Sequence, residues 1–247
     1  MEWGPIRIGC AGWAIPRPYR GEFPVEGSQL QRYATRFSAV EIDSSFYRPH
    51  ERTTYERWAA STPAGFRFAV KLPRAVTHLG GLADLEPLDD FLARVSGLGA
   101  KLGPLLIQLP PRLAFAADRA AAFFAGLRER FAGLAVCEPR HRSWFEAEAE
   151  EVLRSFQVAR AAVDPAPVPA AAEPGGWGEL IYYRLHGSPR MYYSSYSPSY
   201  LQALAERLLA AASAAEVWCI FDNTASGAAI ANALALDEIC SSADPSK

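Results

Sequence analysis

The sequence predicts a (β/α)8 barrel, an α/β fold in which eight parallel strands alternate with helices. Its 247 residues are close to the roughly 250 of one complete barrel. Short apolar runs recur along the chain at intervals of about one helix, and each run ends in polar or charged residues. In such barrels the carboxyl-terminal strand ends form the face that carries chemistry. The predicted strand runs are Ile6–Gly12, Ala39–Tyr47, Arg67–Pro73, Leu102–Pro110, Leu134–His141, Val158–Asp164, Leu180–His186 and Val217–Asn223.

The segments between these runs carry the spacing of amphipathic helices, which we assign to the outer layer. The connection after the sixth strand differs, because Pro165–Gly178 contains four prolines and three glycines. Such a segment cannot hold a normal helix, so we expect an irregular connection there. The predicted helices are Leu30–Phe37, Tyr55–Ala60, Phe91–Leu98, Arg119–Phe131, Phe145–Phe156, Tyr200–Ala212 and Ala228–Ile239.

Composition is that of a globular chain, and we expect one domain over residues 1–247. Half of the residues are hydrophobic and 21% are charged. No apolar stretch reaches the roughly 18 residues that span a bilayer, and Met1–Pro5 lacks a basic segment followed by an apolar one. We therefore expect a cytoplasmic protein without a membrane partner. The net charge of −2 gives no bulk electrostatic argument for nucleic-acid binding, although a local basic patch is compatible with it.

Charged side chains are predicted to converge at the carboxyl-terminal strand ends. Residues two apart on a strand point to the same side, so Glu41 lies on the same side as Asp43, and Arg184 on that of His186. Isolated buried charges cost several kcal/mol, so these groups form a neutralising network, a solvated ligand site, or both. The converging set is Glu41, Asp43, Lys71, Gln108, Glu138, Arg140, Arg184, His186 and Asp222.

Several ordered blocks of the chain resemble the domain-of-unknown-function 72 family, also called YecE-like. The blocks are Gly9–Trp13, Val40–Arg48, Phe66–Pro73, Thr77–His78, Leu102–Pro111, Glu138–Trp144, Tyr183–Gly187 and Phe221–Gly227. The resemblance covers nearly the whole chain and implies a TIM barrel, in agreement with the strand pattern. The family is named for having no established function. The activity most often suggested for it, by structural similarity, is endonuclease-IV-like DNA binding.

The preferred functional hypothesis is a site for a phosphate-bearing ligand, with nucleic acid as the leading class and phosphodiester hydrolysis as the leading reaction. Arginine forks and lysine bind phosphate oxygens, so removal of Arg184 is expected to weaken anion binding. Small residues at the start of the last helix, Ser226 and Gly227, leave backbone N–H groups free for an anion. The predicted ligand-binding residues are Trp13, Lys71, Gln108, Arg140, His141, Arg184, Asn223, Ser226 and Gly227. The predicted catalytic residues are Glu41, Asp43, Glu138, His186 and Asp222.

Two alternatives stay open. The first is a glycosidase-like hydrolase with Glu41 and Glu138 as acid and base, and with Trp13 and Trp144 stacking on sugar rings. Pairing with arginine argues against it, because paired glutamates are expected to stay ionised. The second is a binding protein without turnover.

No cofactor is expected from the sequence, and the identity of any metal is left open. A multinuclear metal centre needs more histidines than His78, His141 and His186 supply near this face. Carboxylates alone suit a single Mg²⁺ or Mn²⁺ ion, which is the one metal that the pattern allows. The sequence does not indicate the oligomeric state.

Overall fold

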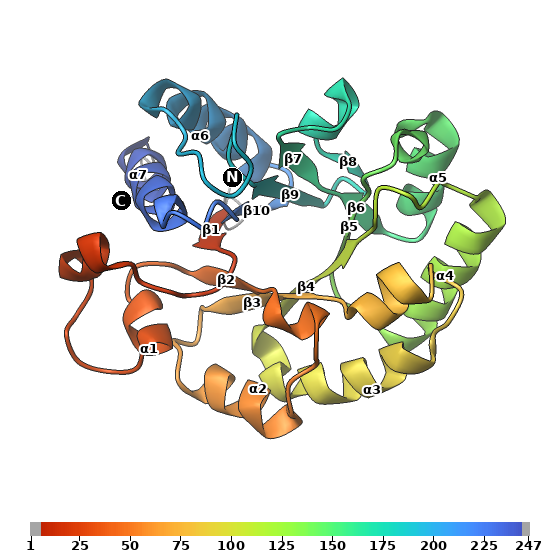
Figure 1. The fold of residues 1–247 in the computed structure, drawn as a ribbon, viewed down its shortest axis with the longest axis horizontal. Helices are drawn as coiled ribbons and strands as arrows, with labels where there is room; N and C mark the ends of the chain where they lie inside the picture. Colours follow the sequence, from red (N-terminus) through yellow and green to blue (C-terminus); the bar gives the residue numbers. More distant parts are fainter. Residues whose placement is uncertain (1–5, 244–247) are drawn as a thin grey trace.

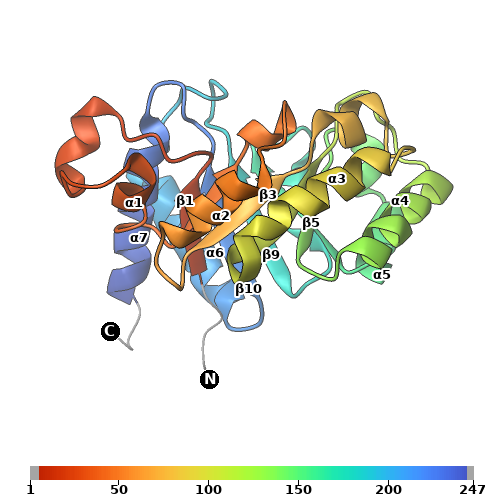
Figure 2. The same cartoon turned by 90° about the horizontal axis from the view of Figure 1, so that it is seen from below.

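The structure is a computed structural model that describes residues 6–243. Two sheets of mainly parallel strands lie inside, and helices pack along their outer sides (Figures 1 and 2). Met1–Pro5, on which the expectation about a leader segment rests, lie outside the described residues. Among residues 6–243, every helix is too short or too polar to cross a membrane.

Strands form at all eight predicted runs, divided between two sheets. The six-stranded sheet has the order β2-β3-β4-β5-β6-β8, and the four-stranded sheet has the order β1-β10-β9-β7. All neighbouring pairs are parallel except β6 and β8. The strands are β1 (Ile6–Cys10), β2 (Ala39–Ile42), β3 (Arg67–Lys71), β4 (Leu102–Gln108), β5 (Ala135–Glu138), β6 (Val158–Arg160), β7 (Ala162–Asp164), β8 (Gly175–Gly176), β9 (Leu180–Leu185) and β10 (Glu216–Phe221).

The helices match the predicted periodic segments to within a few residues at most ends. Ser28 caps α1 as a capping box with Gln31, and the Ser197 side chain accepts from the Tyr200 N–H at the start of α6. The α-helices within residues 6–243 are α1 (Gln29–Tyr33), α2 (Arg52–Ala60), α3 (Glu86–Val95), α4 (Ala117–Arg130), α5 (Ala147–Ser155), α6 (Pro198–Ala212) and α7 (Ala228–Ala243).

The connection from β7 to β9 has no α-helix, as its proline and glycine content predicts. It holds only a 3-10 turn, η6 (Pro169–Ala172), and the two-residue strand β8. Gly176 has a φ of 68°, a left-handed conformation that suits glycine. A stretch of β7 and β9 is therefore left without the helix that would otherwise cover it.

The prediction of a closed barrel is not confirmed, because the strands form two separate sheets. Between β1 and β2, hydrogen bonds through the Tyr33 hydroxyl replace the backbone hydrogen bonds that would join neighbouring strands of one sheet. It accepts from the Cys10 N–H (2.8 Å) and donates to the Ala39 carbonyl (3.0 Å). Within the described residues only one bridge, Ala11 to Glu41, joins these strands directly. At the other boundary the chain leaves one sheet after β6 and enters the other at β7, with one residue between them.

Replacing Gly9 by alanine is expected to lower the free energy of unfolding by about 1–3 kcal/mol. A methyl group on Gly9 would lie 2.1 Å from the Ala39 carbonyl oxygen and 3.0 Å from the Tyr33 hydroxyl, so β1 and β2 would have to separate. Urea denaturation measures the loss. The matched control is Gly21→Ala, because a methyl group on the exposed Gly21 meets no atom within 4 Å. Equal stabilities for the two variants would contradict this account of the boundary.

A second layer of apolar side chains fills the space between the strands below the charged residues. Ala39, Leu106 and Val136 lie in this buried cluster together with Trp218, and the Trp218 ring stacks on Tyr182 with centroids 6.0 Å apart. Gly103 leaves room for the Trp218 ring, which a methyl group there would approach to 2.7 Å. The space between the strands is therefore filled by apolar side chains on one side of the charged residues at the strand ends.

Candidate functional site

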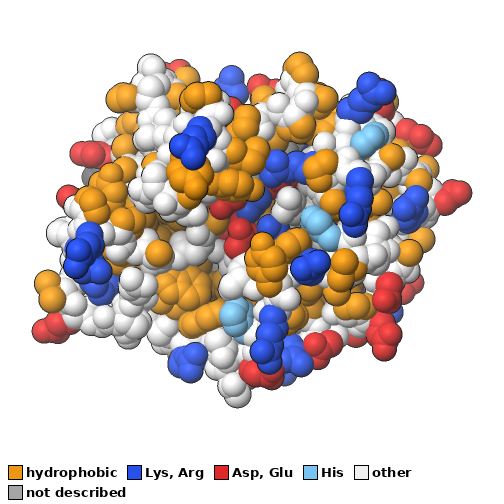
Figure 3. All heavy atoms as spheres, in the orientation of Figure 1, with side chains coloured by type: hydrophobic (Ala, Val, Ile, Leu, Met, Phe, Trp, Pro, Cys, Tyr) orange, Lys and Arg blue, Asp and Glu red, His pale blue; other side chains and the backbone are white. Residues whose placement is uncertain are grey.

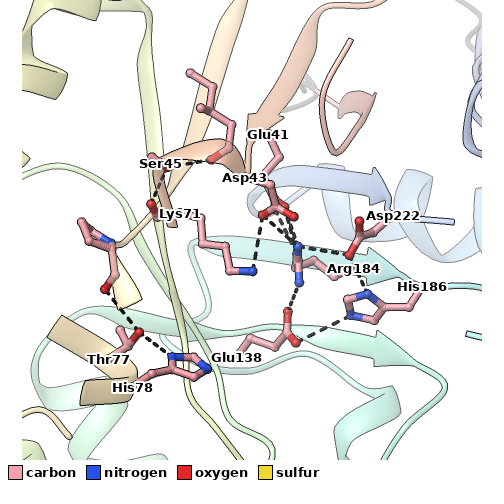
Figure 4. A network of polar contacts seen from close by, with 12 residues as sticks. Glu41, Asp43, Ser45, Lys71, Thr77, His78, Glu138, Arg184, His186 and Asp222 are labelled. Atoms are coloured by element: carbon pink, nitrogen blue, oxygen red, sulfur yellow. Dashed lines mark hydrogen bonds and ion pairs between the residues drawn. The ribbon is translucent and has the colours of Figure 1, made fainter. Parts of the chain in front are cut away.

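Arg184 lies at the centre of a buried charge network between the two sheets (Figure 4). Its Nε donates to both carboxylate oxygens of Glu41 (3.1 and 3.0 Å), and its Nη2 donates to Oε1 of Glu41 (2.6 Å). Its Nη1 donates to Oε2 of Glu138 (2.7 Å). The side chains of both glutamates are fully buried and that of Arg184 is 1% exposed. One guanidinium from β9 thus joins two carboxylates of the six-stranded sheet.

A less buried layer of charges surrounds this centre. Asp43 and Asp222 each have a carboxylate oxygen 3.4 Å from Arg184 Nη2. Lys71 Nζ lies 3.6 Å from Asp43 Oδ1 and 4.4 Å from the centre of the Phe46 ring. The Asp43 side chain is 34% exposed and is the most accessible carboxylate of the network. Solvent and ligands therefore reach Asp43 before they reach the glutamates.

His186 connects Asp222 with Glu138 and Arg140. Its Nδ1 lies 2.9 Å from Asp222 Oδ2, and its Nε2 lies 3.0 Å from Arg140 Nη2 and 3.6 Å from Glu138 Oε1. Arg140 in turn donates from Nε to Glu138 Oε1 (2.6 Å). Burial lowers the pKa of His186, but its contacts with Asp222 and Glu138 outweigh burial and raise the pKa above its ordinary value.

The surroundings of the two buried glutamates shift their pKa values in opposite directions. Burial raises the pKa of Glu41 to about 7, against the opposing charge of Arg184. Burial also disfavours the charged form of Glu138, but Arg184 and Arg140 together hold its pKa well below the ordinary value. The expectation that arginine keeps both glutamates ionised agrees with the lowered pKa of Glu138, whereas Glu41, which faces only one arginine, has a raised pKa.

The network as a whole has one negative charge in excess. Its four carboxylates face three permanent cations, Lys71, Arg140 and Arg184. One proton, on Glu41 or on His186, neutralises it. The interior charges are thus compensated among themselves.

A second group of cations lies at the rim and has no such compensation. Four arginines follow the ends of β3, β4, β5 and β9, in this order: Arg74, Arg112, Arg142 and Arg190. None of these four arginines pairs with an Asp or Glu of residues 6–243. We call them the rim arginines. Figure 3 shows Lys and Arg side chains beside Asp and Glu near the middle of the face that it views, and further Lys and Arg around it.

Two of the rim arginines lie close to His78, whose ring is part of the region drawn in Figure 4. Arg112 Nη2 donates to the His78 carbonyl (3.0 Å), and Thr77 Oγ1 lies 2.9 Å from His78 Nδ1. Burial lowers the pKa of His78, and the charges of Lys71, Arg112 and Arg74 lower it further. The His78 imidazole is therefore surrounded by positively charged side chains.

The sequence as a whole matches one family model. Residues 7–246 match the model described as "Protein of unknown function DUF72". The chain belongs to the DUF72 family. Among curated proteins, it is similar to the UPF0759 protein YecE of Escherichia coli K12, with 31% identity over 42% of this chain and 38% of YecE. It is also similar to the UPF0759 protein YunF of Bacillus subtilis 168, with 28% identity over 62% of this chain and 57% of YunF. These matches span about two fifths to three fifths of the relatives' lengths.

Solved DUF72 structures share the fold. A crystal structure of a DUF72 family protein from Enterococcus faecalis V583 superposes with a TM-score of 0.81 at 21% identity, covering 96% of this chain and 95% of that one. A DUF72 family protein from Thermotoga maritima MSB8 gives a TM-score of 0.77 at 23% identity, covering 96% and 99%. At these identities the likeness shows a mixed α/β fold with parallel sheets, and it does not show an activity.

Eight of the predicted site residues of this DUF72 chain come together in the network, and the others lie elsewhere. Gln108 ends β4 without a polar contact to the network. Trp13 packs edge-on against Trp58 (centroids 4.9 Å apart), and His141 Nδ1 lies 2.8 Å from Ser143 Oγ in a local turn.

The residues expected to bind an anion at the last helix make internal contacts. Ser226 Oγ donates to the Tyr193 carbonyl (2.6 Å), and Asn223 Nδ2 donates to the Ser194 carbonyl and to Asn232 Oδ1, each at 2.9 Å. A methyl group on Gly227, which has a φ of 79°, would meet Pro16 at 2.9 Å. Ser226 and Asn223 thus hold the loop before α6 in place.

Sequence reasoning missed Tyr182 and the four rim arginines. The Tyr182 hydroxyl donates to Glu41 Oε2 (2.7 Å). Its position two residues before Arg184 on the same strand was a usable signal, because such residues share a side. Arg74 and Arg112 were also detectable, because each follows a proline just beyond a strand end.

No group of three or more His, Cys, Asp or Glu side chains in residues 6–243 is arranged to hold a metal ion. The carboxylates of the network instead face guanidinium groups. A single Mg²⁺ or Mn²⁺ ion stays a prediction.

Proposed function

We propose that this chain binds a phosphate-bearing ligand at the carboxyl-terminal strand ends, with nucleic acid as the leading class. The observation that carries the proposal is the contrast between the two groups of charges. Interior cations are held by carboxylates, whereas the rim arginines have no carboxylate partner within residues 6–243. Guanidinium groups without a carboxylate partner fit phosphate oxygens in a fork geometry.

Arg184 has a different role in this proposal from the one that the sequence suggested. All three of its nitrogens donate to carboxylates, and its side chain is 1% exposed. A phosphate would have to displace Glu41 or Glu138 to reach it. Arg184 therefore holds the network together, and the rim arginines, with Lys71 and Arg140 behind them, receive the ligand.

Exposed aromatic rings favour nucleic acid over a small phosphate ester. Tyr47 is 76% exposed, and Tyr192 and Tyr193 in the loop before α6 are also exposed. The Arg190 guanidinium lies 4.0 Å from the centre of the Tyr193 ring. Bases stack on such rings while neighbouring arginines contact the phosphates, which is the usual arrangement for single strands.

We also propose that the two sheets act as one interrupted (β/α)8 barrel. The bridge from Ala11 to Glu41 spans one boundary, and a single residue separates β6 from β7 at the other. In a barrel the loops after all strands share one face. This arrangement supports a single ligand surface built from the rim arginines.

The double variant Arg74→Ala/Arg112→Ala is expected to bind a fluorescein-labelled single-stranded oligonucleotide at least tenfold more weakly than the unmodified chain. Fluorescence anisotropy over a series of salt concentrations measures both affinity and its salt dependence. The slope of log K against log salt should fall by about 0.7 for each phosphate group that the variant no longer binds. The matched control is Arg57→Ala, an exposed arginine in the last turn of α2.

Unchanged affinity in the double variant, or an equal loss in Arg57→Ala, would overturn the proposal. The same oligonucleotide incubated with Mg²⁺ or Mn²⁺ tests for turnover. Shortened products that form with the unmodified chain and not with the double variant support phosphodiester hydrolysis. Binding without products assigns the chain to the non-catalytic class.

A glycosidase-like reaction is the second candidate, because the pKa values of Glu41 and Glu138 are driven apart. Such a pair supplies one protonated acid and one ionised carboxylate near neutral pH. Against it, both carboxylates are fully buried and share one guanidinium. Hydrolysis of aryl glycosides by the unmodified chain, abolished in Glu41→Gln, would favour this candidate over phosphate binding.

A further inference from the structure

A cavity of about 250 Å³ lies outside the charge network, between the strands and α6. One wall comes from β7 and β9, with Asp164 and Leu185, and the facing wall from α6, with Tyr200 and Leu204. The end of the η6 segment closes a third side with Glu173. None of these residues belongs to the network or to the rim arginines.

The cavity exists because the β7–β9 connection lacks a helix. In a regular (β/α)8 unit a helix follows each strand and covers its outer face. Here η6 and β8 replace it, since the prolines and glycines of the connection exclude an α-helix. Figure 1 shows this short segment next to β7, with the long helix α6 on the other side. The strand surface that is left uncovered forms the β7 and β9 wall of the cavity.

The lining combines apolar walls with one carboxylate that has no cationic partner. Asp164 Oδ2 accepts from the Tyr196 hydroxyl (2.8 Å), and no Lys, Arg or His of residues 6–243 forms an ion pair with Asp164. The one arginine of the lining, Arg207, is 3.3 Å from Glu173, so its charge is already paired. The cavity therefore presents an excess negative charge.

Aromatic rings in the lining suit a positive ligand as well. Tyr200 stacks on Tyr196, with centroids 4.6 Å apart, and Tyr183 lines the opposite wall. The face of a tyrosine ring attracts a cation placed over it. A carboxylate, two ring systems and aliphatic walls in a small cavity are complementary to an ammonium group with an apolar body.

We propose that this cavity binds a small primary ammonium compound with an apolar body, with its ammonium group at Asp164. The site is independent of the phosphate surface and rests on different residues. Leu185 and Leu204 contact the apolar body. Arg207, held by Glu173, stays paired at the edge.

The probe for this site is 2-phenylethylammonium, compared with neutral 2-phenylethanol and anionic 3-phenylpropanoate. Isothermal titration calorimetry on the whole chain is expected to show binding of the ammonium compound alone. Asp164→Asn should weaken it at least tenfold, because the amide keeps an acceptor for the Tyr196 hydroxyl but removes the charge. Equal affinity for the ammonium and the alcohol, or no binding of either, would overturn the proposal.

A second variant tests the cavity without changing its charge. Ala203 lines the cavity from the exposed side of α6, so Ala203→Phe should fill the space and abolish binding. Its thermal midpoint should stay that of the unmodified chain, which separates a blocked site from a misfolded one. Full binding by Ala203→Phe would show that the probe lies elsewhere and would overturn the assignment.

Discussion

Replacing Arg184 by alanine is expected to lower the free energy of unfolding by about 3–5 kcal/mol. The substitution leaves Glu41 and Glu138 fully buried without the guanidinium that joins them. Removing one partner of a buried ion pair costs more than the pair contributes, because the remaining charge stays desolvated. Urea denaturation at neutral pH measures the change.

The control for this prediction is Arg154→Ala, which removes an exposed ion pair with Glu151. That loss should stay below about 1 kcal/mol. If Arg184→Ala does not fold, adding Glu41→Gln is expected to recover part of the stability, since it removes a carboxyl that, without Arg184, can be buried only by taking up a proton above its ordinary pKa. A loss for Arg184→Ala as small as that of the control would show that water reaches the network.

Stability is expected to decline as the pH rises from about 4.5 to about 7, by about 3 kcal/mol for Glu41 alone. The pKa of Glu41 is about 7 in the native state against an ordinary value of 4.5. In this interval the native state holds a proton that the unfolded state has lost, so the free energy of unfolding falls with rising pH. The raised pKa of His186 acts in the same direction, and its contribution is lost as the pH rises through its native value.

At low pH, stability is limited by two carboxyl groups whose pKa values are lowered in the native state. Glu138 and Asp222 have lowered pKa values, so the stability that they contribute is lost as the pH falls below their ordinary range. We therefore expect a maximum of stability at mildly acidic pH. Urea denaturation of the unmodified chain and of Glu41→Gln over this range tests the assignment. The variant should lose most of the decline, and two parallel curves would contradict it.

The sequence predicted the positions of the strands and the convergence of charge because both follow from local rules. Apolar runs of strand length place β1 to β10 to within a few residues, apart from the two-residue β8. The parity of side chains along a strand places Glu41 on the same side as Asp43, and Arg184 on the same side as His186. Both rules use only neighbouring residues, so one sequence suffices.

The features that escaped prediction depend on contacts between distant residues. The division into two sheets rests on Tyr33, a helix residue whose hydroxyl inserts between β1 and β2. The role of Arg184 depends on which hydrogen-bond acceptors surround its guanidinium in the folded chain. Parity brings lysine, arginine and carboxylates together, but only the three-dimensional geometry shows that Arg184 is saturated while Arg74 and Arg112 have no carboxylate partner within residues 6–243.

The irregular β7–β9 connection also divides the charge network along the chain. Glu41 and Glu138 precede it, whereas Arg184 and Asp222 follow it, and 143 residues separate Arg184 from Glu41. During synthesis, the first six strands leave the ribosome with two carboxylates whose shared partner has not yet been made. Their native burial has to wait for β9. The interior is therefore completed late, and a nascent chain that stops before β9 cannot reach the native arrangement of its own first half.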